Sequence, residues 1–305
     1  MTSINLTTLD QAKTPSMKSQ ARFLGILVNS ILMVFCLACL FPMVIVISTS
    51  FSEETDILQN GYTVLPRKFT AFAYEYIFGD PSQILRAYSV TISVTTVGTI
   101  LGLLIMSLLA YALSRKQFIF RRPLNFYLLF TMLFSGGLVP YYILVTQYLD
   151  LDDKFMVLVL PYLVSPWYVF LLRTFFQGLP QELLDSAKID GAGEFRILFQ
   201  IIIPLSAPAL ATVALFLILM YWNDWWLSLL FIRNRKLYPI QLMLYNILMN
   251  IKAMEANPGN IQMSLPPSET VRMAMAVLAA GPVTIIFLFL QKYFVRGILI
   301  GSLKG

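Results

Sequence analysis

The chain alternates between long apolar runs and shorter polar connections. Six apolar runs are long enough to cross a bilayer, whose hydrocarbon core of roughly 30 Å requires about 20 helical residues. They are residues 24–50, 87–113, 123–148, 155–176, 201–230 and 272–291. In lipid, backbone amides and carbonyls must be paired within a helix or a closed barrel. The short alternating strands of a barrel are absent from the sequence. We therefore predict an all-α integral membrane protein with six transmembrane helices.

The composition agrees with a membrane protein. Of the 305 residues, 58% are hydrophobic and 12% are charged, whereas a soluble protein carries roughly 25% charged residues. Such a chain cannot supply a charged exterior for a soluble fold of this length. A disordered, coiled-coil, collagen-like or nucleic-acid-binding protein is excluded as the main class. The net charge of +6 is attributed to orientation in the membrane.

Basic residues orient the predicted helices. With the N-terminus inside, four segments face the cytoplasm and hold 13 of the 22 Lys and Arg residues: 1–23, 114–122, 173–200 and 292–305. Lysine and arginine are enriched in cytoplasmic loops. The last predicted outer loop does not follow this rule, because it carries five basic residues. We predict a membrane domain over 24–291, between cytoplasmic tails at 1–23 and 292–305. The first span is longer than the apolar core of a signal peptide, roughly 7–15 residues, and is expected to remain as an anchor.

Residues that carry chemistry are scarce. There is no histidine, which excludes histidine metal sites and Ser-His-Asp triads. Cys36 and Cys39 lie in an apolar span and are interpreted as small buried hydrophobic side chains rather than a redox pair. Charged residues fall in loops, tails and span ends, which argues against ion-coupled transport and against an intramembrane enzyme. We predict no catalytic residue, no metal site and no cofactor bound by this chain.

Prolines and glycines interrupt the predicted spans. Such breaks are tolerated in a membrane where neighbouring helices or a cavity satisfy the freed backbone groups. The residues are Pro42, Gly98, Gly102, Gly136, Gly137, Pro140, Pro161, Pro166, Pro204, Pro208 and Pro282. Their number favours a bundle that moves or lines a path. The alternative is that proline and glycine are simply frequent in membrane helices.

The connection over residues 178–204 is polar and reads GLPQELLDSAKIDGAGEFRILFQIIIP. Glu182 suits the first turn of a helix, where the helix dipole favours negative charge. Asp190 and Gly191 are expected to end that helix, because glycine adopts the left-handed cap conformation. A second amphipathic helix is expected over 194–203. This helix–turn–helix suits a groove on another protein, and an ordinary interfacial loop helix is an equal alternative.

The same loop resembles the E-A-A–x3–G–x9–I–x–L-P motif of bacterial ABC-importer permeases. The matching residues are Asp185, Ser186, Ala187, Gly191, Ile201, Ile203 and Pro204. The departures from the motif keep an acid, a small residue and an apolar residue in place. The longer string ELLDSAKIDGAGEFRILFQIIIPLSAPAL is similar to the second permease subunit of maltose-type carbohydrate importers. The runs SGGLVPYY and QKYFVRGILIGSLKG add weaker support, and the resemblance spans nearly the whole chain.

The resemblance implies a type I ABC-importer permease bundle with a cytoplasmic coupling helix, in a bacterial cytoplasmic membrane. In that family two permease subunits form the path, two cytoplasmic ATPase subunits drive it and an extracytoplasmic binding protein delivers the sugar. The expected partners are therefore a second, different permease, the ATPases, the binding protein, a sugar of the oligosaccharide class and the lipid bilayer. ATP and Mg would be bound by the ATPase, because this chain contains no G-x-x-x-x-G-K-[ST] loop.

The resemblance also implies which residues couple the chain to the ATPase. In the family the loop helix lies in a groove on that subunit. The residues carried over are Glu182, Asp185, Ser186, Ala187, Asp190, Gly191 and Pro204. Gly191 is expected to act through its backbone geometry.

A second candidate site is the run YWNDWW near the outer end of the fifth span. Aromatic side chains can stack on sugars, and amide or carboxylate groups can bind hydroxyls. The candidate substrate-path residues are Tyr221, Trp222, Asn223, Asp224 and Trp225. The alternative is an interfacial aromatic belt or packing. Asp224 is costly near the hydrocarbon and marks a path, a partner or a cavity, unless it pairs with Arg233 or Arg235.

Two other functions are compatible with the residues. A membrane scaffold could dock a cytoplasmic partner without transporting anything, and an ABC permease could serve a solute other than sugar. The outer loops 51–86 and 231–271 are expected to meet the binding protein, with a plain connector as the alternative for 231–271.

Overall fold

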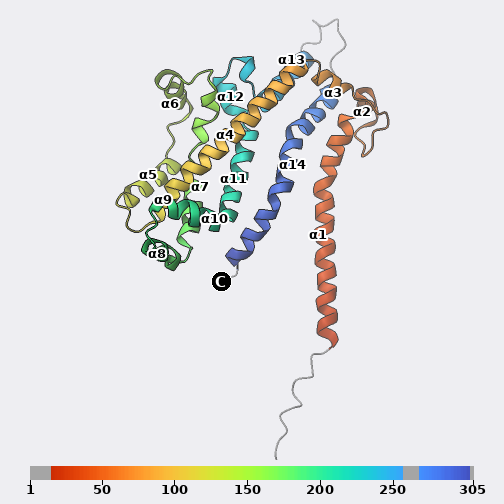
Figure 1. Cartoon of the computed structure of the whole chain (residues 1–305). Coiled ribbons are helices and arrows are strands. Elements are labelled where there is room, and N and C mark those ends of the chain that lie inside the picture. The colour runs from red at the N-terminus through yellow and green to blue at the C-terminus, as the bar shows by residue number, and fades with distance from the viewer. Residues whose placement is uncertain (1–14, 257–267, 303–305) are drawn as a thin grey trace, which may run out of the picture. The chain divides into compact units, whose positions relative to one another are not determined.

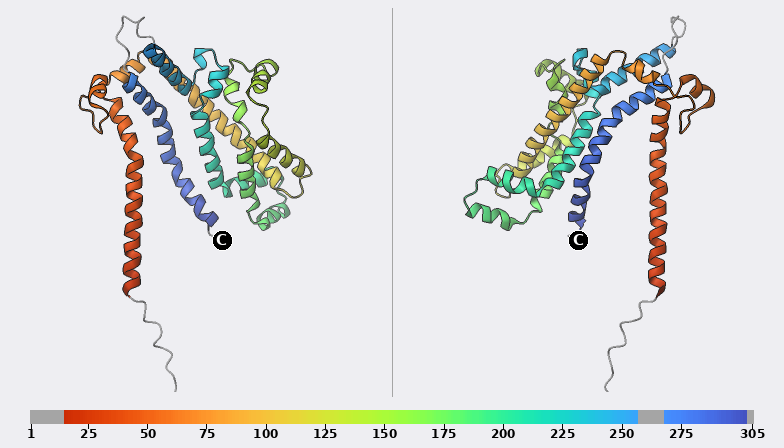
Figure 2. Two further views of the ribbon diagram at one scale, coloured as in Figure 1. Left: turned by 180° about the vertical axis from the view of Figure 1, so that it is seen from behind. Right: turned by 45° about the vertical axis from the view of Figure 1, so that its right-hand side comes forward.

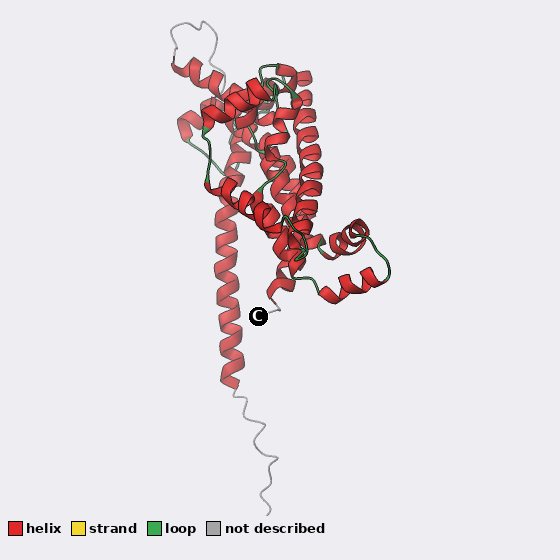
Figure 3. Ribbon diagram, turned by 90° about the vertical axis from the view of Figure 1, so that its left-hand side faces the viewer, coloured by secondary structure: helices red, strands yellow, loops and turns green. Residues whose placement is uncertain are grey.

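The computed structural model describes residues 15–256 and 268–302, which are almost entirely helical (Figure 3). No strand occurs in these two stretches, and one isolated bridge pairs Ser52 with Phe69. The chain divides into two compact units, Met1–Tyr74 with Pro267–Ala274 and Glu75–Pro266 with Met275–Gly305. The helical prediction is thus confirmed for the described residues.

The elements are labelled in Figure 1. In chain order they are α1 (Pro15–Ser50), α2 (Glu54–Asn60), α3 (Phe72–Ile77), α4 (Pro81–Ser114), α5 (Arg121–Leu133), α6 (Leu138–Ile143), η2 (Leu144–Tyr148), η3 (Phe155–Leu158), η4 (Leu160–Tyr162), α7 (Pro166–Gln177), α8 (Gln181–Ile189), α9 (Glu194–Ile197), η5 (Leu198–Ile202), α10 (Ile203–Leu205), α11 (Ala207–Trp222), α12 (Trp226–Phe231), η6 (Arg235–Leu237), α13 (Ile240–Ala256) and α14 (Ser268–Ser302). The segments η2 and η5 are π-helical, and the other η segments are 3₁₀ turns.

Three stretches of continuous helix are long and apolar enough to cross a membrane, namely Leu24–Ser50, Pro81–Ser114 and Glu269–Phe289. Three further stretches qualify only as bent pairs. They are Arg121–Leu133 with Leu138–Tyr148 (116°), Phe155–Tyr162 with Pro166–Gln177 (48°) and Glu194–Leu205 with Ala207–Trp222 (82°). The described residues therefore contain three to six spans. The expected spans 123–148, 155–176 and 201–230 are not single helices.

The breaks follow some of the prolines and glycines and not others. Gly137, with φ +83°, separates α5 from α6. Pro166 occupies the start of α7, where its missing amide costs no hydrogen bond. In contrast, Pro42 and Pro282 lie inside the uninterrupted helices α1 and α14. A proline in an apolar span is therefore not by itself the end of a helix.

The N-terminus of α4 is capped by Asp80. Its carboxylate accepts hydrogen bonds from the Ser82 hydroxyl (2.7 Å) and from the amides of Ser82 (3.1 Å) and Gln83 (3.3 Å). Pro81 fills the first helical position. The Ser82 hydroxyl, and then the Gln83 amide, lower the pKa of Asp80 below its ordinary value. The cap fixes the starting point of the helix around which its unit is built.

In that unit α4 packs mainly against α7 and α11, and these three helices run together through it (Figure 2). Met106, Leu172 and Leu217 are fully buried between them. The closest approach is at Gly98 of α4, where an added Cβ would lie 2.3 Å from the Tyr221 ring of α11. The Tyr221 hydroxyl in turn donates to the Val159 carbonyl (2.9 Å). The φ of Gly98 is ordinary, so the position does not require the conformational freedom of glycine. It requires the absence of a Cβ.

The proline inside α14 is compensated by a neighbouring helix. Pro282 has no amide hydrogen, so the Leu278 carbonyl, four residues earlier, loses its helical donor. The Tyr88 hydroxyl of α4 donates to that carbonyl (2.9 Å). The indole nitrogen of Trp222 donates to the next carbonyl, of Ala279 (2.9 Å). The expectation that neighbours satisfy the freed backbone is confirmed at this proline.

We expect the cost of Tyr88→Phe to depend on Pro282. In the native background the change leaves the Leu278 carbonyl without a donor and should destabilise the protein by about 1 kcal/mol. In a Pro282→Ala background the new amide at 282 serves the same carbonyl, so the cost should nearly vanish. Unfolding free energies of the two single variants and the double variant in detergent give the coupling. Equal costs of Tyr88→Phe in both backgrounds would contradict this account.

The other unit is built on the C-terminal end of α1. Phe51 stacks on Phe69 (5.5 Å between centroids) and on Tyr74 (4.8 Å). Glu54 caps α14, since its carboxylate accepts from the amides of Glu269 and Thr270, both at 2.9 Å. A carboxylate at a helix N-terminus is stabilised by the helix dipole.

Several expected boundaries differ from the structure. Helix α1 begins within the expected tail 1–23, and α14 continues past residue 291. Cys36 and Cys39 are exposed on α1 rather than buried. The expected loop 231–271 contains the 17-residue helix α13. Four other residues of this expected loop lie outside the described residues, namely Pro258, Gly259, Pro266 and Pro267.

Candidate functional site

The predicted helix–turn–helix is formed by α8 and α9. The Gly191 amide donates to the Lys188 carbonyl (3.0 Å), and the Ala192 amide donates to the Ala187 carbonyl (2.9 Å). This pair of bonds is the Schellman motif, which needs a left-handed residue after the helix. Gly191 has φ +77°. The prediction that Gly191 ends the helix in this conformation is confirmed.

Helix α8 has one buried side and one exposed side. Leu184 and Ala187 are buried against the rest of the unit. The other polar candidates all lie on exposed positions, namely Glu182, Asp185, Ser186 and Asp190. The polar side is free of contacts with the core, so it is available to a partner, whereas Ala187 contributes to packing.

Apolar side chains that the motif did not indicate are also exposed here. Leu183 is 46% exposed on α8, and Phe195 is 73% exposed on α9. Ile189, directly before the turn, is 86% exposed. Ile189 falls outside the buried stripe of Leu184 and Ala187, and this mismatch with the helical period is the signal in the sequence that could have found it. Leu183 gives no such signal, because it lies four residues before Ala187 and is exposed all the same. Exposed apolar side chains beside a polar face are typical of a protein interface.

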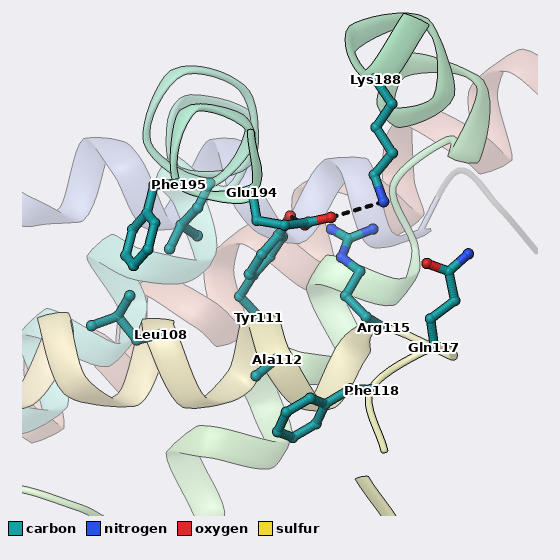
Figure 4. A pocket seen from close by; sticks show the side chains of 10 residues that line it. Leu108, Tyr111, Ala112, Arg115, Gln117, Phe118, Lys188, Glu194 and Phe195 are labelled. Carbon is teal, nitrogen blue, oxygen red and sulfur yellow. Dashed lines mark hydrogen bonds and ion pairs between the residues drawn. The ribbon is translucent and has the colours of Figure 1, made fainter. Parts of the chain in front are cut away.

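A hydrogen-bonded cluster holds the helix–turn–helix to the end of α4 (Figure 4). The Glu194 carboxylate accepts from the Tyr111 hydroxyl of α4 and forms an ion pair with Lys188 (2.8 Å). Glu194 therefore joins α8, α9 and α4 at one point. The Arg115 guanidinium lies over the Tyr111 ring, 4.4 Å from its centroid, in a favourable cation–π arrangement.

The cluster lines a cavity of about 390 Å³ between the end of α4 and α9. Leu108, Phe118, Phe195 and Leu198 form its apolar wall (Figure 4 labels the first three).

The chain continues from the helix–turn–helix into α11 through a bend. Segment η5 is π-helical, and Pro204 lies in the short α10 that follows it. At the fully buried Ser206 the axis turns by 82° into α11. Pro204 is thus placed at the connection between the helix–turn–helix and the apolar helix α11. π-Helical turns inside helices are frequent at functional positions.

We expect the hydrogen bond between Glu194 and Tyr111 to stabilise the cluster more than the ion pair between Glu194 and Lys188. Tyr111 is 7% exposed, and a hydrogen bond to a carboxylate contributes roughly 1.5–3 kcal/mol. The Lys188–Glu194 pair is 38% and 55% exposed, and such a pair contributes at most about 1 kcal/mol. Tyr111→Phe should therefore measurably lower the free energy of unfolding of the purified protein. Lys188→Gln, the matched control, should change it little, and the reverse order would contradict this ranking.

The aromatic run at the end of α11 is divided between buried and exposed residues. Tyr221 and Trp222 are 2% and 3% exposed, and each hydrogen-bonds a backbone carbonyl of another segment. Asn223 and Trp225 are exposed. Trp225 stacks on Tyr245 of α13, with 4.9 Å between the ring centroids. The structure therefore brings only part of the candidate path to an accessible surface.

Asp224 has partners other than the expected arginines. Its carboxylate accepts a hydrogen bond from the Tyr162 hydroxyl (2.9 Å). Arg233 instead forms an ion pair with Asp152 (3.3 Å). The proposed pairing of Asp224 with Arg233 is therefore wrong. Through the Tyr162 bond, Asp224 links the turn that follows α11 to η4.

Within residues 15–256 and 268–302, no cluster of three or more His, Cys, Asp or Glu side chains could hold a metal ion. The geometry is that of a bundle of apolar helices with a helix–turn–helix at one end and an aromatic, polar turn directly after α11.

The comparisons with known proteins agree with this architecture. Residues 102–300 match the family described as binding-protein-dependent transport system inner membrane component. The polygalacturonan/rhamnogalacturonan transport system permease protein YtcP of Bacillus subtilis is 38% identical over 93% of this chain and 99% of its own length. The trehalose/maltose transport system permease protein MalG of Thermococcus litoralis is 31% identical, over 92% and 96%.

A solved structure gives the same result. A chain in the crystal structure of a bacterial ABC transporter involved in import of the acidic polysaccharide alginate has a TM-score of 0.78 and 29% identity, and the match covers 90% of this chain and 98% of that one. The fold and the helix–turn–helix therefore define a permease subunit of an ABC importer. The chain belongs to the family of binding-protein-dependent transport system inner membrane components. Members are non-catalytic transmembrane subunits, and ATP is hydrolysed by a separate ATPase.

Proposed function

We propose that this chain forms half of the translocation path of an ATP-driven importer of oligosaccharides. The proposal is supported by the names of its relatives, which specify polygalacturonan or rhamnogalacturonan, arabinooligosaccharides, and trehalose or maltose. The other half is a second, different permease. Each bent helix pair forms one span, which gives six spans with both termini in the cytoplasm.

The single observation that carries the mechanism is the end of α8 at Gly191. The left-handed turn sets the angle between α8 and α9, and Glu194 fixes both to α4. The exposed side of α8, with Asp185 and Ser186, enters a groove on the ATPase. Closure of the ATPases then moves α8 and α9 together and displaces α4 and α11.

The assembly is tested by purifying the tagged chain from native membranes. An ABC ATPase, a second permease and a solute-binding protein are expected to accompany it. Uptake of labelled oligosaccharides, acidic and neutral, by reconstituted vesicles then identifies the solute. If the chain is isolated without any ATPase, or if the complex imports a solute other than sugar, the proposal is wrong.

We also propose that Asn223 and Trp225 contact the sugar, while Tyr221 and Trp222 support them by packing. Both proposed contacts are exposed, and the Gln241 amide donates to Asn223 (3.4 Å), so an amide pair lies beside an aromatic face. Trp225→Ala should raise the KM of uptake severalfold with little effect on protein level. Trp167→Ala is the matched control, because Trp167 is 62% exposed on α7. An unchanged KM for Trp225→Ala would exclude a sugar contact and leave packing as the role of the aromatic run.

A further inference from the structure

We propose that a basic cavity at the end of α4 binds the phosphate headgroup of an anionic membrane phospholipid. The cavity has a volume of about 620 Å³. Its lining residues are Lys116, Gln117, Phe118, Ile119, Arg121, Arg122, Asn125 and Arg173. Four of these eight side chains are cationic and none is anionic, so the site selects a negative charge.

Two of the cations are held in place by neutral partners. Arg121 donates from Nε to the Leu113 carbonyl (3.1 Å), and Arg173 donates to the Asn125 amide oxygen (2.6 Å). In the amide orientation that satisfies its neighbours, the Gln177 oxygen accepts from both arginines, at 3.0 and 3.3 Å. These bonds orient the guanidinium groups without neutralising them. An anion that enters the cavity therefore meets donors that are already ordered.

No protein carboxylate neutralises the cavity in the described part of the chain. The ion pairs found among the described residues involve Lys68, Lys154, Lys188, Arg233 and Arg272. None of the cavity's cations belongs to a pair. Like charges in a site next to the hydrocarbon repel one another, because the local dielectric is low. A bound phosphate removes that repulsion.

The adjoining helix favours a lipid over a free anion. Helix α5 begins at Arg121, and a stripe of aromatic residues four apart follows along it. Phe126, Phe130 and Phe134 are 69%, 46% and 62% exposed, and neighbouring rings in the stripe lie 6.3 and 4.4 Å apart. A headgroup in the cavity would place its acyl chains on this stripe. Basic pockets between membrane helices bind lipid headgroups in this way.

The cavity also adjoins the coupling helix. A neighbouring cavity of about 590 Å³ shares Lys116 and Arg121 and is lined on its other side by Asp185 and Lys188 of α8. The lipid would therefore lie in the leaflet on the side of the coupling loop. Its presence changes the charge next to α8.

The test measures lipid binding to the purified importer complex by native mass spectrometry. The variant carries Lys116→Gln with Arg122→Gln, because both side chains are exposed and make no hydrogen bond to the fold. Each basic residue near an anionic lipid contributes about a fivefold change in binding, so phosphatidylglycerol should bind roughly 30-fold more weakly. Phosphatidylcholine binding should not change. Arg235→Gln with Lys236→Gln removes the same charge elsewhere and should leave phosphatidylglycerol binding as in the native chain.

Three results would overturn the proposal. The first is equal phosphatidylglycerol binding by the variant and the native chain. The second is displacement of the lipid by millimolar inorganic phosphate, which would assign the cavity to a free anion. The third is loss of the ATPase subunits from the variant complex, which would assign the cationic residues to protein docking. Equal thermal stability of both complexes in phosphatidylcholine nanodiscs shows that the variant is folded.

Discussion

Replacing Gly191 with valine is expected to abolish coupled transport while the protein remains inserted in the membrane. At φ +77° a β-branched residue is strongly disfavoured, and a residue held in this region costs roughly 1–3 kcal/mol. No atom lies within 4 Å of an added Cβ at Gly191, so backbone strain is the whole effect. Relief of that strain unwinds the Schellman turn and changes the angle between α8 and α9, the two helices proposed above to transmit ATPase closure. Oligosaccharide uptake and solute-stimulated ATP hydrolysis should both fall at least tenfold.

The chain offers a matched control two residues away. Gly193 also has open space around it, but its φ is −70°, which valine adopts readily. Gly193→Val should therefore keep uptake and ATP hydrolysis near native values. Gly191→Asn should be intermediate, because asparagine tolerates the left-handed region. If Gly191→Val and Gly193→Val behave alike in membrane insertion and in transport, the backbone account of coupling fails.

Adding a methyl group at Gly98 is expected to produce the largest loss of stability. The new Cβ of Gly98→Ala would lie 2.3 Å from the nearest carbon of the Tyr221 ring, well inside contact distance. The ring is 2% exposed, and its hydroxyl is bonded to the Val159 carbonyl, so it cannot move aside without breaking that bond. Overpacking of this kind costs roughly 1–3 kcal/mol. The thermal midpoint of the purified protein should fall by several degrees.

Two further variants separate this collision from a general effect of alanine in a helix. Gly281→Ala lies in α14, where nothing is within 4 Å of the added Cβ, and the lower backbone entropy of alanine should leave stability equal or higher. Tyr221→Leu removes the ring atoms that collide. In the Tyr221→Leu background, Gly98→Ala should cost much less than it does alone. Additive effects of the two changes would rule out the contact as the cause.

The sequence was sufficient to predict the structural features that depend on local chemistry. Apolar runs and the requirement for internal hydrogen bonds predict helices, and the Asp190–Gly191 pair predicts the helix end that the structure has. Neither Glu194 nor Tyr111 was predicted to form the joint with α4, because the two residues lie 83 positions apart. That pairing is set by the packing of the bundle. No local pattern in the sequence encodes it.

The helix breaks show the same limit. Pro166 and Gly137 lie at breaks, each at the start of a new helix, whereas Pro282 lies inside an unbroken one, although each has the local chemistry of a breaker. The difference at Pro282 is a hydroxyl supplied by Tyr88 from another helix. In the aromatic run, likewise, residue type suggested sugar contacts for five consecutive positions. Burial by α4 and α14 removes Tyr221 and Trp222 from the accessible surface.

Helix α4 runs without a break and forms one long, stiff element of the subunit. Its 34 residues extend over roughly 50 Å at 1.5 Å per residue. One end is held at Tyr111 by the helix–turn–helix, and the other end holds α13 and α14 through Thr91 and Tyr88. A rod of that length that tilts by about 5° moves its far end by about 4 Å. On the function proposed above, a small displacement of α8 would therefore reach the distant end of α4, where α13 and α14 are attached, as a movement of several ångströms.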